Sequence, residues 1–98
     1  MIKIYGMATC PDCTFVEAQA KGDNRFEIID IGTHVRHLKE FLKLRDTSSA
    51  FDKARANGSV GIPCFVLDDG TVTLSPEKVG LKSRMSEGSY CSIDGKGC

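Results

Sequence analysis

The first thirty residues carry the pattern that most restricts how this chain can fold. Residues 2–5 are β-forming and lead into Gly6, and residues 26–29 form a second run of strand character. Between them, residues 11–20 suit a helix, with Pro at its first position and Gly22 just past its end. A strand, a helix and a strand within so short a segment predict two parallel strands joined by a right-handed crossover.

A second helix is expected after Thr33, which can cap its N-terminus. Its apolar residues recur at helical spacing and are predicted to pack in the core; they are Val35, Leu38, Phe41 and Leu42. Three basic residues are expected on its solvated face, where they could also attract an acidic partner; they are Lys39, Lys43 and Arg45. This helix is therefore predicted to cover part of the sheet.

The second half of the domain predicts a short helix, a hairpin and a last helical turn. A Ser-x-x-Asp capping box beginning at Ser49 indicates a helix over about 49–57. Two β-forming runs, 64–67 and 71–74, flank a loop that contains Gly and is typical of an antiparallel hairpin. Ser, Pro and Glu at the start of 75–81 favour a last short helix.

Composition and charge exclude several classes of protein. The chain has 98 residues, 41% of them hydrophobic and 27% charged, as in one soluble domain. Thirteen basic residues balance thirteen acidic ones without a block of like charge, so neither nucleic acid nor an anionic membrane is a predicted partner. We find no signal peptide and no run of about 18 apolar residues. A monomeric cytoplasmic protein is expected.

Two regions are predicted along the chain: a domain over 1–82 and a flexible tail over 83–98. The tail is rich in Gly and Ser and shows no apolar periodicity. It contains Cys91 and Cys98, which could relay electrons to Cys10, form their own disulfide or be inert. The spacing of these cysteines does not decide between the three.

The Cys10-Pro11-Asp12-Cys13 sequence at the start of the first helix is the strongest chemical signal. Disulfide exchange needs a thiolate, and the free N–H groups that open a helix stabilise one. Cys10 is therefore the predicted nucleophile, and Cys13, one turn further in, is the less exposed and less acidic resolving thiol. The charge of Asp12 opposes the thiolate, so we expect a moderate lowering of the Cys10 pKa.

Metal binding is the alternative reading of the same cysteines. Cys-x-x-Cys is half of many zinc sites, and with tail cysteines or a second subunit the pair could hold zinc or an iron–sulfur cluster. Because no second paired set of ligands is evident and Pro11 lies between the thiols, we predict no metal at this site. His34 and His37, three residues apart, are expected on a solvated helix face rather than as ligands.

Residues 4–13, Ile-Tyr-Gly-Met-Ala-Thr-Cys-Pro-Asp-Cys, and residues 61–66, Gly-Ile-Pro-Cys-Phe-Val, resemble the glutaredoxin branch of the thioredoxin-like superfamily. The resemblance spans about 1–82 and implies an α/β, thioredoxin-like fold with a four-stranded mixed β-sheet flanked by helices. It implies a glutaredoxin-like thiol–disulfide oxidoreductase with catalytic Cys10 and Cys13. It also implies a cis bond before Pro63.

The resemblance further implies where a substrate would lie, over Ile62 and Pro63 and beside the residues that flank Cys10, which are Thr9, Pro11 and Asp12. No tightly bound cofactor is expected; glutathione or another thiol would be a co-substrate, and a thioredoxin reductase is another donor. Dithiol glutaredoxins usually have an aromatic residue where this chain has Asp12 and a basic one near Met7. Glutathione and protein disulfides therefore both remain open as substrates.

Cys64 directly follows Pro63 and could be a third thiol near the site. The preferred interpretation is a buried strand residue that behaves as a small hydrophobic side chain.

Overall fold

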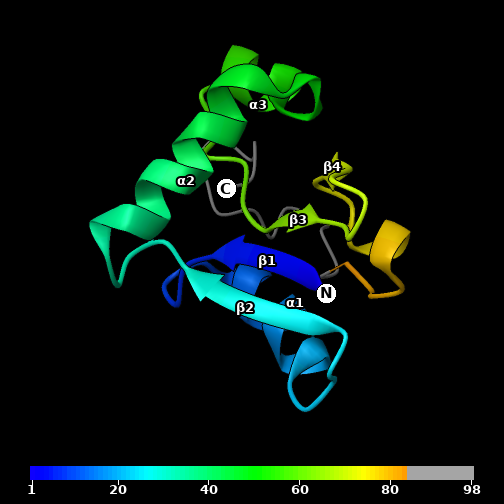
Figure 1. The fold of residues 1–98 in the computed structure, drawn as a ribbon. Coiled ribbons are helices and arrows are strands. Elements are labelled where there is room, and N and C mark those ends of the chain that lie inside the picture. Colours follow the sequence, from blue (N-terminus) through cyan, green and yellow to red (C-terminus); the bar gives the residue numbers. More distant parts are fainter. Residues whose placement is uncertain (84–98) are drawn as a thin grey trace.

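The computed structural model describes residues 1–83, which form an α/β fold built on one four-stranded mixed sheet (Figure 1). The elements in chain order are β1 (Ile2–Gly6), α1 (Pro11–Ala20), β2 (Phe26–Asp30), α2 (Val35–Thr47), a 3₁₀ helix η1 (Ser49–Phe51), α3 (Asp52–Asn57), β3 (Cys64–Val66), β4 (Val72–Thr73) and a 3₁₀ helix η2 (Pro76–Val79). The strand order is β2-β1-β3-β4. Most of the predicted tail lies outside the described residues.

Strand pairing agrees with the sequence. β1 and β2 are parallel with Tyr5 opposite Ile29, so α1 forms the predicted crossover between them. β3 runs antiparallel to β1, with Tyr5 opposite Cys64, and β4 runs antiparallel to β3 in the predicted hairpin. β1 therefore lies in the interior of the sheet, and the loop that follows it leaves from the sheet's centre.

The two faces of the sheet are buried by different helices, because successive side chains of a strand point to opposite faces. Ile4 and Phe65 pack with Val16 and Ala20 of α1 on one face. Tyr5 and its neighbour on β3 pack on the other face with the aromatic side chains of α2 and η1, which are Phe41 and Phe51. The rings of Phe41 and Phe51 meet edge to face at 5.6 Å between centroids.

The prediction that the apolar stripe of α2 is core is wrong for three of its four residues. Phe41 is fully buried, but Val35, Leu38 and Leu42 are 61, 37 and 40% exposed. Helical periodicity identifies an apolar face, but it does not determine how much of that face the sheet reaches. α2 thus keeps an exposed apolar surface.

The predicted cap of α2 is also wrong. Thr33 donates its hydroxyl to the carbonyl of Asp30 at 2.9 Å, so it is engaged in the preceding turn. His34 is the N-cap instead, and its Nδ1 accepts the N–H of Arg36 at 2.9 Å. This bond gives His34 a structural role.

The remaining helical turns differ in detail from the prediction. Ser48 rather than Ser49 caps η1 by accepting the N–H of Ala50 at 3.2 Å, so the predicted capping box does not form. The Asp52 carboxylate pairs with Arg55. The last helix is the short 3₁₀ turn η2. Its N-cap residue makes no side-chain capping bond. Within residues 1–83, no helix is long and apolar enough to cross a membrane.

Candidate active site

The loop after β1 brings Cys10 to the first turn of α1. Cys10 is the N-cap residue with extended backbone angles, and Pro11 occupies the first helical position. The Cys10 N–H donates to the carbonyl of Met7 at 3.1 Å, and the Cys10 carbonyl accepts the N–H of Thr14 at 3.0 Å. These bonds hold the Cys10 sulfur where the helix leaves its own N–H groups free.

The pKa of Cys10 is lowered to about 7. The largest cause is a hydrogen bond from the Cys13 side chain, and the backbone N–H groups of Cys13 and Asp12 add to it. Burial acts in the opposite direction, as does the negative charge of Asp12, which is the smallest of these effects. The predicted moderate lowering is confirmed, and a large fraction of Cys10 is thiolate near neutral pH.

Cys13 has the opposite character. Its side chain is fully buried, whereas that of Cys10 is 6% exposed. The hydrogen bond to Cys10 and the loss of solvent both raise the pKa of Cys13. Cys13 is therefore the less exposed and less acidic thiol, as predicted.

The segment around Pro63 lies at the same end of the central strands as the cysteine loop. Because Tyr5 lies opposite Cys64, the chain before Cys64 runs beside the end of β1 from which the cysteine loop starts. The Ile62–Pro63 peptide bond is cis, as the resemblance implied. Cys10, Cys13 and Ile62 belong to one buried cluster. The structure therefore brings together the two motifs that are far apart in sequence.

Arg45 positions the loop before Pro63, a role that the sequence did not indicate. Its Nε donates to the carbonyl of Val60 at 2.9 Å and its Nη2 to the carbonyl of Ser59 at 2.7 Å. Gly61 has φ +94°, and a Cβ there would lie 2.7 Å from two ring atoms of Phe51. The prediction of a merely solvated Arg45 is thus wrong, since the side chain ties α2 to this loop.

The other residues of the predicted site flank Cys10 or line the core. Thr9 and Pro11 are exposed, Asp12 is half-buried, and Ile62 and Pro63 are buried. Among residues 1–83, no backbone group forms a hydrogen bond to the N–H or C=O of Ile62. Ile62 therefore lies outside the pairing of β1 with β3, which extends only as far as Cys64.

Cys64 is fully buried in β3, and burial raises its pKa to about 12. This confirms the interpretation of Cys64 as a small hydrophobic side chain, because a thiol that is protonated at neutral pH is a poor nucleophile.

No three His, Cys, Asp or Glu side chains of residues 1–83 are grouped as a metal site. His37 has a neighbour of its own, since its Nδ1 lies 3.3 Å from the carbonyl oxygen of Asp30. Cys91 and Cys98 lie outside the described residues.

Glu17 is a site residue that the sequence reasoning missed. A Cβ built on Gly6 would lie 2.9 Å from Oε2 of Glu17 and 3.0 Å from Sγ of Cys13, so both atoms border the same small space. Burial and the charge of Asp30 raise the pKa of Glu17. The signal was present in the sequence, because Glu17 follows Cys13 by four residues and so shares its helix face.

An apolar recess of about 400 Å³ begins beside the cysteine loop. It is lined by Met7, Ile31, Gly32, Thr33, His34, Val35 and Leu38, with no Lys or Arg among them. The exposed apolar surface of α2 therefore forms one wall of a hollow next to Cys10, whose N–H is bonded to Met7.

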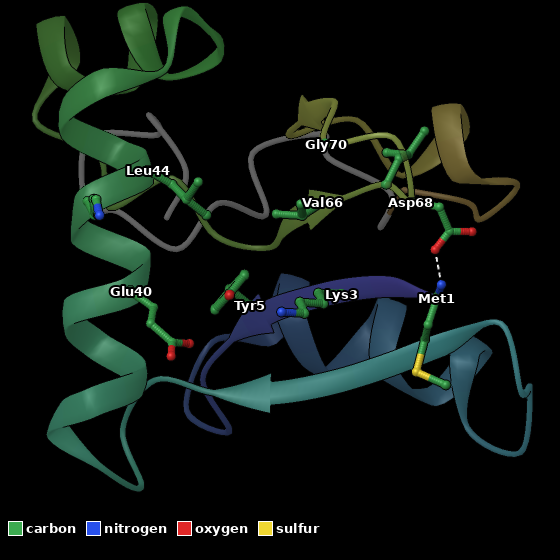
Figure 2. A pocket seen from close by; sticks show the side chains of 10 residues that line it. Met1, Lys3, Tyr5, Glu40, Leu44, Val66, Asp68 and Gly70 are labelled. Atoms are coloured by element: carbon green, nitrogen blue, oxygen red, sulfur yellow. Dashed lines mark ion pairs between the residues drawn. The ribbon is translucent and has the colours of Figure 1, made fainter.

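A second recess of about 500 Å³ lies on the sheet face beside α2, where Lys3 and Tyr5 of β1 face Glu40 of α2 (Figure 2). An ion pair between the N-terminal amine and Asp68 borders it at the far end of the strands (Figure 2). No residue of the cysteine loop or of the Pro63 segment lines this recess, so it is separate from the candidate active site.

Comparison with known proteins gives one informative relative. No family model matches the chain, and no solved structure matches it. An uncharacterized protein of Haemophilus influenzae is 39% identical over 77 residues, which cover 78% of this chain and 90% of the relative. This chain therefore belongs to the same family as that Haemophilus influenzae protein.

Proposed function

We propose that this protein is a glutaredoxin-like thiol–disulfide oxidoreductase in which Cys10 is the nucleophile and Cys13 the resolving thiol. The observation that carries the proposal is the hydrogen bond between two cysteines at the start of α1, where the pKa of Cys10 is lowered to about 7 and that of Cys13 is raised. In such a pair one cysteine is a thiolate that can attack a disulfide, and the other stays a protonated thiol until the resolving step.

The first step is attack by the Cys10 thiolate on a substrate disulfide. The sulfur of Cys10 forms a new S–S bond with one substrate sulfur, and the other substrate sulfur leaves with the electron pair of the broken bond. The amides of Cys13 and Asp12 favour the thiolate, and Pro11 at the first helical position leaves the helix opening intact.

The second step is attack by Cys13 on the mixed disulfide. Cys13 loses its proton and bonds to the Cys10 sulfur, and the remaining substrate sulfur leaves as a thiolate. The protein dithiol is oxidised by two electrons to a Cys10–Cys13 disulfide while the substrate disulfide is reduced. Glutathione or a thioredoxin reductase would restore the dithiol, in a reducing compartment such as the cytoplasm.

The mixed four-stranded sheet and the cis peptide bond before Pro63 support a thioredoxin-like fold of the glutaredoxin type. In that fold the cysteine loop and the proline segment meet at one end of the central strands, and the register of Tyr5 opposite Cys64 fits this arrangement. Ile62 would then offer its backbone to the substrate.

We propose a protein disulfide as the preferred substrate. The recess beside Met7 is apolar and has no Lys or Arg in its lining, so it suits a hydrophobic side chain better than the carboxylates of glutathione. Val35 and Leu38, exposed at its edge, would contact such a side chain.

The test is a single turnover of the reduced full chain with a peptide disulfide, with Cys91 and Cys98 replaced by Ser to simplify the products. The parent should reduce one disulfide and form the Cys10–Cys13 bond, which mass spectrometry of digested protein identifies. Cys10→Ser should be inactive, and Cys13→Ser should hold the peptide as a mixed disulfide on Cys10.

Two outcomes would contradict the proposal. Full activity of Cys10→Ser would mean that Cys10 is not the nucleophile. Stoichiometric zinc or iron held by Cys10 and Cys13 in anaerobically purified protein would favour the metal-binding alternative. Repeating the assay with a peptide–glutathione mixed disulfide separates the substrates, since a faster reaction with this compound would overturn the preference for proteins.

A further inference from the structure

The resolving step needs a proton acceptor, because Cys13 is fully buried and its pKa is raised. A thiol attacks only after it loses its proton, and water has little access to a sulfur in this position. If the proposed function holds, some group near the Cys13 sulfur must receive that proton.

Gly6 creates the space in which such a group can approach. It is the last residue of β1 and is opposite Asp30 of β2. Because Gly6 has no side chain, α1 can lie close to β1. A Cβ on Gly6 would lie 2.9 Å from Oε2 of Glu17 and 3.0 Å from Sγ of Cys13. A methyl group at this position would collide with both atoms.

Glu17 also has the mixed surroundings that a proton carrier needs. It is half-buried, so part of its side chain is exposed to solvent. Among residues 1–83, the charged group that acts on Glu17 is Asp30 of β2, and the charge of Glu17 in turn raises the pKa of Cys13 on its own helix. Burial and Asp30 raise the pKa of Glu17, which reduces the difference between its pKa and that of a thiol.

We propose that Glu17 accepts the proton of the Cys13 thiol when Cys13 attacks the mixed disulfide at Cys10. The S–H bond of Cys13 breaks, an O–H bond forms on the Glu17 carboxylate, and the Cys13 sulfur bonds to the Cys10 sulfur as the substrate thiolate leaves. The protonated carboxyl then passes its proton to solvent. The transfer also avoids two negative charges on adjacent groups, a carboxylate and a thiolate.

The test compares Glu17→Gln with the parent in the resolving step alone, starting from an isolated mixed disulfide between Cys10 and a peptide. Glu17→Gln should release the peptide on the order of 100-fold more slowly. Its rate should rise with pH, because deprotonation of Cys13 would then depend on solvent hydroxide, whereas the parent rate should change little above the pKa of Glu17. Mixed-disulfide formation in a Cys13→Ser background should be unchanged by Glu17→Gln.

Glu27→Gln is the matched control, because Glu27 is an exposed glutamate on β2 and should leave the resolving step unchanged. Glu17→Asp keeps a carboxylate, so it should keep the flat pH profile at a reduced rate even if Glu17→Gln fails to fold. A parent-like rate and profile in Glu17→Gln, or a steep profile in Glu17→Asp, would overturn the inference. Failure of the parent itself to form a mixed disulfide would instead overturn the proposed function.

Discussion

Cys13 donates a hydrogen bond to the sulfur of Cys10, and this bond is the largest cause of the difference in acidity between the two thiols. It stabilises the thiolate of the acceptor and the protonated form of the donor. Because Cys13 lies in the first turn of α1 and Cys10 is its N-cap, the backbone amides act on Cys10 in the same direction. Because the pKa of Cys10 is about 7, the reduced pair carries close to one negative charge only above that pH.

The first prediction concerns the pH dependence of Cys10 reactivity. Since the pKa of Cys10 is about 7, its alkylation rate by iodoacetamide should rise with pH and reach half its plateau near that value. Below this pH the thiol is protonated and slow, and well above it the thiolate fraction no longer increases. Mass spectrometry of the Cys10 peptide at a series of pH values measures the profile.

Cys13→Ala is the informative variant for this prediction, because it removes the largest cause of the lowered Cys10 pKa. The midpoint should move toward that of an ordinary thiol but stop short of it, since the amides of residues 12 and 13 remain. An unchanged midpoint would mean that the side-chain hydrogen bond has no influence on Cys10.

The second prediction concerns Asp12, whose charge raises the Cys10 pKa. Asp12→Asn should lower the midpoint of Cys10 alkylation, by less than about one pH unit because the carboxylate is half-exposed and screened. The matched control is Asp46→Asn, an exposed aspartate on α2. A higher midpoint in Asp12→Asn would contradict the assigned sign.

The elements predicted correctly are those whose signals lie within the element. The parallel pair follows from two β-forming runs around a helix that starts at Pro11, and the hairpin follows from the loop before Gly70. The position of Cys10 and Cys13 at the start of that helix follows from the same Pro11 signal. Each of these inferences needs only local propensity and spacing.

The features that the sequence did not indicate depend on contacts between elements. The spacing of four residues places Glu17 on the same face of α1 as Cys13, but the approach of that face to Gly6 depends on tertiary packing. The role of Arg45 depends on where the loop at Val60 lies. Likewise, the exposure of Val35 depends on how far the sheet extends under α2. Periodicity names a face of a helix, but only tertiary packing determines what that face meets.

The third prediction concerns Gly61, where two separate effects disfavour a side chain. Its φ of +94° is a backbone conformation that favours glycine, and a Cβ would lie 2.7 Å from Phe51. Gly61→Ala should therefore lower the free energy of unfolding by about 2–4 kcal/mol, measured by urea denaturation.

Gly22→Ala is the matched control for the third prediction, because Gly22 has φ +82° with nothing within 4 Å of a new Cβ. Gly22→Ala should lower the free energy of unfolding only by the cost of the backbone conformation, about 1 kcal/mol. Equal losses in the two variants would mean that Phe51 can move away without cost.

The fourth prediction concerns Arg45, which holds the loop before Pro63 through the carbonyls of Ser59 and Val60. Arg45→Met keeps the aliphatic part of the side chain and removes both hydrogen bonds, so the free energy of unfolding should fall by about 1–2 kcal/mol. Because the loop leads to the proposed substrate-binding backbone of Ile62, KM for a peptide disulfide should rise.

The Cys10 alkylation profile should not change in Arg45→Met, since Arg45 is not among the causes of the Cys10 pKa. This combination distinguishes loosening of the proline loop from general damage to the site. Arg36→Met, on the exposed part of the same helix, is the matched control and should alter neither stability nor KM. If Arg45→Met raised the alkylation midpoint and left KM unchanged, Arg45 would act on the cysteines rather than on the substrate loop.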